Sequence, residues 1–340
     1  MNSILKIQGA LKIQGALKFV YTSADLNNWV NNLYTYNLPL PNNNVLGALE
    51  NLLFGLNRYN LRSKIFRLNL FCGGDWRGSF FPIIADQGAA NWDYNGSHGS
   101  TFSDLTNGPF QSGDWSLING FDPSRLNTAI TGTSQSPNGM YLDTGILANS
   151  TGFVNGSIHT SVYINSNGFK TTTDRLTDIG ATYNTYGIAL RSNYRPTNNN
   201  PGFLTYSLNT TINTTTNALL YSSPPSSFSP LGFIVGTRTS LSSTTFYRDA
   251  VKPTAQTGYF NPNTNNVITN TMPNATITIF SSGAASANNN GFGVSRPSNS
   301  EYSDRQTTMY SIGSGLSDTD VVNYTNLIQT FNTAIGRNNY

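Results

Sequence analysis

The sequence predicts an all-β sandwich of the jelly-roll kind that carries a few packing helices, two near the N-terminus and one at the C-terminus. Three observations support this fold class. Short strand candidates recur from residue 65 onward, turn-rich stretches such as NNNPG and SSPPSS separate them, and helical periodicity is confined to the two ends of the chain. Many short strands between Gly-, Pro- and Asn-rich turns are typical of sandwiches and jelly rolls.

Near its N-terminus the chain carries a direct repeat, LKIQGALKIQGALK, over residues 5–18. Its large apolar side chains fall at odd positions and its lysines and glutamines at even positions, which is the period of a β-strand. The apolar face consists of Leu5, Ile7, Leu11, Ile13 and Leu17. Because a lone strand is not stable in water, we expect residues 1–18 to be an extended arm that docks on a neighbouring subunit by strand addition. The alternatives are an edge strand of the chain's own sheet and a disordered tag.

Residues 19–62 are predicted to form a layer of two helices. Ser23 is a candidate N-cap, and Pro39 and Pro41 separate the two helices. The apolar positions with helical spacing are Leu26, Trp29, Val30, Leu33 and Tyr34 in the first helix and Leu46, Leu49, Leu52, Leu53 and Leu56 in the second. We expect no insertion into a membrane, because no apolar run reaches the roughly 18 residues that span a bilayer.

Residues 63–340 are predicted to form one jelly-roll sandwich, since no stretch within them has the composition of a linker. The segment IFRLNLF, residues 65–71, alternates as a strand does. Further strands are expected at Thr160–Ile164, Ile179–Thr182, Gly187–Arg191, Phe203–Leu208, Ala218–Tyr221, Gly232–Arg238, Thr244–Arg248 and Thr276–Phe280.

A strand, a glycine turn and a helix are predicted to close the sandwich. Residues 307–312 alternate, and Gly313 and Gly315 bracket a turn. Ser317 and Asp320 have the spacing of a capping box, and Gly336 stands where a C-terminal cap belongs. One apolar stripe consists of Val321, Tyr324, Leu327, Ile328, Phe331 and Ile335. We expect this stripe to pack on the preceding sheet.

The run TTMYSIGSGLSDTDVVNYTNLIQTFNTAIGR resembles the closing segment of concanavalin A-like (laminin G-type) jelly-roll modules that are common in bacteriophage structural proteins. SADLNNWVNNLYTY, NGMYLDTGI, TTFYRDAV and ATITIFSSG fit the same modules in order, so the resemblance covers Tyr21 to Arg337. It implies a concanavalin A-like fold and a place on a virion surface. The virion would assemble in the host cytoplasm, and other virion proteins and further copies of the chain would be the partners.

Composition and charge narrow the classes of function. Charged residues make up only 10% of the chain and the formal net charge is +3, without any cluster of five lysines or arginines, so we expect no nucleic-acid partner. Abundant Asn, Ser, Thr and Gly suit a particle-surface or extracellular structural protein. The single cysteine, Cys72, excludes an internal disulfide and a cysteine-based metal site, and we expect it to be buried.

The sequence favours a protein that is not an enzyme. Retaining glycosidases on such folds need two carboxylates about 5 Å apart, in the pattern Glu-x-Asp-x-Glu, but the only glutamates are Glu50 and Glu301. His98 and His159 have no ligand-like spacing, so neither a metal nor another cofactor is expected. A site built from distant aspartates, as in a glycan hydrolase, is the weaker alternative.

The best candidate for a binding site is aromatic. Its carbohydrate-binding residues would be Trp76, Trp92, Asp93, Tyr94 and Trp115. Aromatic planes stack on the C–H faces of sugars, while aspartate and asparagine bind the hydroxyls. The alternative is that each tryptophan fills the core. Calcium at Asp75, Asp86 or Asp93 would suit oxygen ligands, but these residues have no ordered ligand spacing.

The sequence therefore predicts a phage virion structural protein, a surface-exposed jelly-roll subunit that decorates a capsid or belongs to a tail and is attached through its N-terminal arm. The alternative is a glycan-binding adhesin that recognises a receptor, with a glycan on the host surface as its partner.

Overall fold

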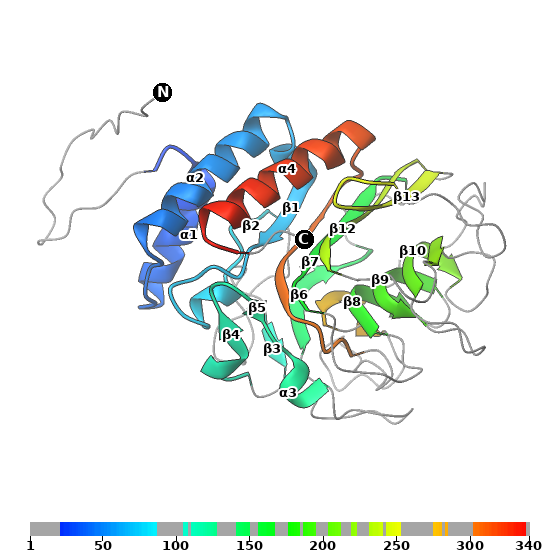
Figure 1. Ribbon diagram of the computed structural model, residues 1–340, viewed down its shortest axis with the longest axis horizontal. Helices are drawn as coiled ribbons and strands as arrows, with labels where there is room; N and C mark the ends of the chain where they lie inside the picture. The colour runs from blue at the N-terminus through cyan, green and yellow to red at the C-terminus, as the bar shows by residue number, and fades with distance from the viewer. Residues whose placement is uncertain are drawn as a thin grey trace, which may run out of the picture.

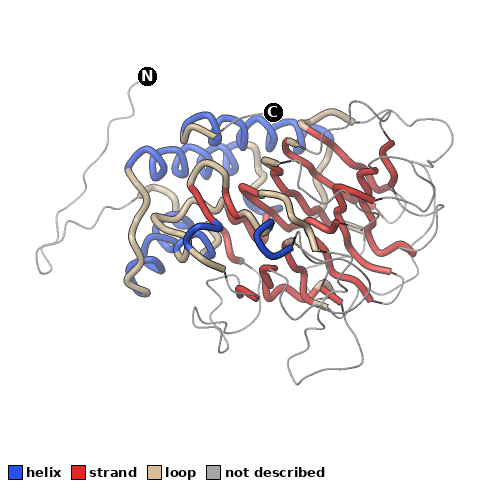
Figure 2. Tube along the Cα trace, turned by 60° about the horizontal axis from the view of Figure 1, so that its bottom comes forward, coloured by secondary structure: helices blue, strands red, loops and turns tan. Residues whose placement is uncertain are grey.

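A computed structural model of the chain shows two β-sheets packed face to face, with a layer of helices on the outer face of one of them (Figures 1 and 2). The structure describes residues 21–86, 105–107, 110–127, 141–149, 156–166, 176–183, 186–194, 203–211, 219–222, 231–240, 243–252, 275–280, 283–284 and 302–337. Within these ranges the chain is mostly antiparallel β-structure, and the predicted fold class is confirmed.

The helix layer consists of α1 (Ala24–Thr35), α2 (Asn43–Arg58) and α4 (Asp318–Ala334). Local sequence signals set their ends. The Ser23 side chain accepts a hydrogen bond from the Leu26 N–H at the start of α1, and Asn42 does the same for Val45 in α2. Helix α4 starts with the predicted capping box of Ser317 and Asp320. The three predicted helices are therefore confirmed.

The sheet under the helices, called here the inner sheet, has the strand order β13, β12, β7, β16, β1 and β2, with the hairpin β4–β5 attached through β16. These strands are β13 (Ser243–Arg248), β12 (Gly232–Ser240), β7 (Ile158–Ile164), β16 (Thr307–Gly313), β1 (Ile65–Asn69), β2 (Ile84–Ala85), β4 (Trp115–Ser116) and β5 (Gly120–Phe121). Strand β16 comes from the C-terminal end of the chain, yet it lies at the centre between β7 and β1. The closing segment is thus an internal part of this sheet.

The second sheet, called here the outer sheet, has the order β11, β10, β9, β8, β14, β6 and β3, and β15 pairs with β8. Its strands are β11 (Leu219–Ser222), β10 (Phe203–Thr211), β9 (Tyr186–Tyr194), β8 (Leu176–Tyr183), β14 (Thr276–Ile279), β6 (Tyr141–Leu147), β3 (Leu105–Asn107) and β15 (Gly283–Ala284). A short helix, α3 (Ser124–Asn127), and three 3-10 turns at Arg62–Lys64, Gly78–Phe80 and Ser112–Asp114 complete the described elements. Every strand predicted from the sequence overlaps one of these strands.

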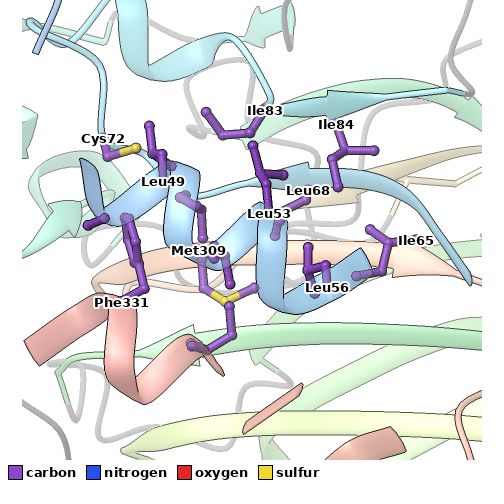
Figure 3. Packing of buried hydrophobic residues seen from close by; sticks show 14 of the residues in the cluster. Leu49, Leu53, Leu56, Ile65, Leu68, Cys72, Ile83, Ile84, Met309 and Phe331 are labelled. Carbon is purple, nitrogen blue, oxygen red and sulfur yellow. The ribbon is translucent and has the colours of Figure 1, made fainter. Parts of the chain in front are cut away.

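Two hydrophobic clusters hold the three layers together. The first lies between the helices and the inner sheet, where Leu53 of α2, Leu68 of β1 and Met309 of β16 meet (Figure 3). The second lies between the two sheets and includes Val162 of β7 and Ile179 of β8. Cys72 is buried in the first cluster, as predicted, and burial raises the pKa of its thiol to about 12. Burial of this kind is the main stabilising contribution in such a fold.

The helix stripes match the sequence pattern with one correction. The predicted stripe of α2 is buried throughout, and so is that of α4 except for Leu327, which is half-buried against α2. Tyr34, predicted to belong to the stripe of α1, is instead 57% exposed. It lies next to buried Leu33 at the end of the helix, so the stripe of α1 is narrower than its apolar residues suggest.

The chain after α4 returns to the sandwich. Gly336 has φ +81°, a conformation that residues with a Cβ rarely adopt, and the predicted C-terminal cap is thus confirmed. The next residue, Arg337, is buried, and its guanidinium donates to the carbonyl oxygens of Leu117, Thr308 and Phe71 at 2.7, 3.1 and 3.2 Å. Burial lowers the pKa of Arg337 to about 10. This side chain ties the helix end to β16 and to the hairpin that positions the candidate site.

Candidate functional site

The candidate site is built from the turn after β1 and from the β4–β5 hairpin, which bring Trp76 and Trp115 to one aromatic cluster. The turn is tightly folded, because a Cβ on Gly73 would lie 2.3 Å from the carbonyl carbon of Gly78. Asp75 closes it by accepting a hydrogen bond from the Gly78 N–H at 2.8 Å. Trp76 is therefore carried by a turn whose backbone is fixed.

Four phenylalanines form the floor under the two tryptophans. Phe80 stacks on Phe121 with ring centroids 4.7 Å apart, and Phe110 meets both rings edge-on at 5.6 Å. Phe71 completes the floor through an edge contact with Phe121 at 5.0 Å. Such tilted and offset pairs are the favoured geometries of aromatic rings. These residues lie in the cluster between the sheets, so the floor is rigid.

The two tryptophans lie at the rim of this floor and are half-buried. Trp76 meets Phe80 edge-on with centroids 5.8 Å apart. The indole N–H of Trp115 donates to the carbonyl oxygen of Phe71 at 3.0 Å, and that oxygen also accepts from Arg337. Each indole is thus anchored on one side and accessible on the other. An anchored, partly exposed indole is suited to stacking on an apolar ligand face.

Ion pairs flank both tryptophans and neutralise the charges beside them. Asp75 pairs with Arg77 at 2.6 Å, and Asp114 pairs with Arg125 at 2.7 Å. Asp114 is buried, and its second oxygen also accepts from the Gln111 N–H at 2.8 Å. All four carboxylate oxygens therefore accept hydrogen bonds from the protein itself. The rim has no net charge from these pairs, which favours an uncharged ligand.

Among the predicted carbohydrate-binding residues, the structure brings Trp76 and Trp115 together. Trp92, Asp93 and Tyr94 lie outside the described residues, as does the predicted apolar face of the arm. The sequence reasoning missed the aromatic floor itself. Its signal was present in the four phenylalanines that occur between residues 71 and 121, but these are spread over several turns and short strands.

A buried histidine near the start of α4 has the contacts of a catalytic group but no access to a substrate. His159 Nε2 lies 3.1 Å from Ser311 Oγ, and Nδ1 lies 2.6 Å from the Ser314 carbonyl oxygen, so Nδ1 donates this hydrogen bond. The ring is fully buried, and its edge contact with Tyr324 places it under α4. Burial lowers the pKa of His159 to about 4, which keeps the ring neutral. This pair serves to hold α4 and β16 together.

The carboxylates considered as catalytic or metal-binding groups have structural partners where the structure describes them. Asp320 caps α4, and Asp178 accepts from Ser303 Oγ at 2.7 Å inside the sandwich. Asp86 and Asp25 both bind Arg62. Glu50 accepts from the N–H groups of Thr22 and Ser23. Within the described ranges, no three His, Cys, Asp or Glu side chains are grouped so that they could hold a metal ion.

Glu301 and Asp174 lie outside the described residues. No helix in the described part of the chain is long and apolar enough to cross a bilayer.

Comparison with known proteins gives only partial likenesses. No family model matches the chain, and neither does any curated protein. One similar solved structure, described as the crystal structure of a receptor binding domain, is 16% identical with a TM-score of 0.41, covering 80% of this chain and 52% of its own. Another comes from work on the dependence of botulinum neurotoxin type C cell entry on two ganglioside molecules. It is 14% identical with a TM-score of 0.38, covering 78% and 52%.

This chain thus spans about half the length of both structures. At these scores the likeness carries no conclusion about the site.

Proposed function

We propose that this chain is a lectin-like recognition subunit that binds an uncharged glycan at the surface formed by Trp76 and Trp115. The observation that carries this proposal is the pair of anchored, half-buried indoles on one aromatic floor. Stacking on such rings gives affinity without a charge on the ligand. The neutralised ion pairs beside them agree with an uncharged sugar rather than an acidic one. The subunit binds and does not cleave its ligand.

The finer proposal is that this subunit lies on the surface of a virion, as the resemblance to bacteriophage structural modules implies. Recognition of a host glycan there is the task of an adhesin. The subunit would assemble in the host cytoplasm and attach to other virion proteins through residues 1–18. Low charge and abundant amide and hydroxyl side chains suit such an exposed place.

A second candidate function is a structural virion subunit without a ligand, which decorates a capsid or belongs to a tail. One observation favours it. The carboxylates beside the tryptophans are fully occupied by arginines and backbone N–H groups, so they offer few acceptors to sugar hydroxyls. In this function Trp76 and Trp115 would only close the edge of the core.

Glycan binding separates the two functions. We expect the full chain to bind at least one neutral glycan of a broad panel, and Trp76→Ala to raise the dissociation constant at least about tenfold, because truncation of a central aromatic contact costs about 1–2 kcal/mol or more. Phe54→Ala is the matched control, since Phe54 is an exposed aromatic on α2. Its affinity should equal that of the parent chain.

Two outcomes would contradict the proposal. Failure of the parent chain to bind any glycan of the panel would favour the structural subunit. Binding that Trp76→Ala leaves unchanged would move the site away from this aromatic floor. Retention of the parent unfolding midpoint by each variant shows that a change in affinity is local.

A further inference from the structure

The described chain starts at the rim of the helix layer, and its first residues are tied down there. The Tyr21 N–H donates to Asn27 Oδ1 at 2.9 Å. The N–H groups of Thr22 and Ser23 donate to Glu50 of α2 at 2.7 and 3.2 Å. The N-terminal repeat, residues 5–18, is therefore connected to the body at the outer side of α1 and α2.

The outward surface of the helix layer is nearly free of charge. Among the exposed positions of α1, α2 and α4, only Arg58 and Asp318 are charged. The others are Asn, Thr, Ala, Gly, Val and aromatic residues, and Phe54 and Tyr34 are 66% and 57% exposed. Depletion of charge and exposure of aromatic side chains are the compositional signs of a protein interface.

The repeat is complementary to itself when two copies run antiparallel. We consider the register in which position numbers of facing residues add to 22. On the apolar face, Leu11 then faces Leu11 of the second copy, and Leu5 faces Leu17. Each glycine faces an isoleucine, because Gly9 pairs with Ile13 and Gly15 pairs with Ile7. The gaps that glycine leaves in one strand are thus filled from the other.

The polar face supports the same register. Lys6 faces Ala16, Lys12 faces Ala10, and Gln8 faces Gln14, so no two lysines oppose each other. A shift to a sum of 24 places Lys6 against Lys18 and Lys12 against Lys12, which is unfavourable because like charges in facing positions repel. A shift to a sum of 20 avoids that repulsion.

The register with a sum of 20 is nevertheless poorer on the apolar face. It places Leu17 against Ser3 and Leu5 against Gly15. The register with a sum of 22 loses neither contact, because the same two leucines face each other. Facing apolar pairs are the unit that stabilises a two-stranded ribbon.

We propose that two copies of this chain associate by antiparallel pairing of residues 5–17, and that the apolar face of this ribbon packs on the uncharged surface of the helix layer around Phe54 and Tyr34. A two-stranded ribbon is only marginally stable alone, and packing on helices supplies the support it needs. The repeat's main-chain groups are satisfied by the partner's repeat. The partner is thus a second copy, and this proposal does not depend on glycan binding.

Cysteine scanning of the full chain tests the pairing and its register. In the proposed register Leu11 lies on the two-fold axis, where facing Cβ atoms are about 4.5–5.5 Å apart and a disulfide can form with little adjustment. Oxidised Leu11→Cys should give a covalent dimer of twice the 37.0 kDa chain mass. The matched controls Ala10→Cys, Lys12→Cys and Ile13→Cys should remain mostly monomeric on denaturing gels. Native Cys72 is buried and does not compete.

Strongest cross-linking at any of the three control positions would overturn the proposed register. Absence of a dimer in sedimentation of the parent chain would overturn the pairing itself. Phe54→Lys tests the docking surface and should raise the dimer dissociation constant at least about tenfold. Val251→Lys is its control, because Val251 is 65% exposed beside β13 and should leave the dimer intact. Equal effects of the two lysine variants would exclude the helix layer as the docking surface.

Discussion

Replacing Arg337 with methionine should lower the free energy of unfolding by about 3–5 kcal/mol. The guanidinium donates to three main-chain carbonyl oxygens, those of Leu117, Thr308 and Phe71. Methionine fills much of the space but leaves these acceptors without a donor, and a buried acceptor that loses its partner costs about 1–3 kcal/mol. Chemical denaturation monitored by tryptophan fluorescence measures the change.

Arg58 provides the matched control for this prediction. It is exposed at the end of α2, where its guanidinium lies 5.7 Å from the ring centroid of Tyr59. Arg58→Met should change the free energy of unfolding by less than about 1 kcal/mol. An Arg337→Met chain as stable as Arg58→Met would show that Arg337 does not hold the hairpin and β16 together.

Replacing Gly313 with alanine should cost about 2–3 kcal/mol, because Gly313 at the end of β16 lies between β1 and β7 without space for a methyl group. A Cβ there would lie 1.9 Å from the carbonyl oxygen of Lys64 and 2.6 Å from Cε1 of His159. Both strands would have to move, and overpacking of this kind costs about 1–3 kcal/mol. Thermal and chemical unfolding of the variant give the value.

Gly47 is the control, because a Cβ at this exposed position of α2 would meet no atom within 4 Å. Gly47→Ala should raise the free energy of unfolding by about 0.5–1 kcal/mol, since alanine favours the helix over glycine. Opposite signs for the two substitutions are the expected result. A neutral effect of Gly313→Ala would mean that β16 is not clamped between its neighbours.

Local signals explain why the helices could be predicted from the sequence. The capping box of Ser317 and Asp320, the apolar stripe and Gly336 all lie within one segment, and each is present in α4. Strand β6 was not predicted, because Asp143 and Thr144 interrupt its apolar pattern. Both are nevertheless buried, and Asp143 accepts from Thr276 Oγ1 at 3.0 Å. Polar residues that find partners across a sheet hide a strand from pattern analysis.

The candidate site could be predicted only as a set of residue types. Its geometry depends on contacts between segments that are distant in sequence. The carbonyl oxygen of Phe71 meets the indole of Trp115 44 positions later and the guanidinium of Arg337 266 positions later. No local pattern links these three residues. The sequence therefore identified Trp76 and Trp115 but not the aromatic floor that anchors them.

The most direct test of this account removes residues 1–18 and compares the truncated chain with the parent. The account assigns glycan recognition to the body and assembly to the N-terminal repeat. Truncation should therefore leave the unfolding midpoint and the glycan affinity per chain unchanged, while dimers and incorporation into larger assemblies are lost. A large fall in the unfolding midpoint with assembly intact would contradict the account, because residues 1–18 would then be an ordinary strand of the chain's own sheet.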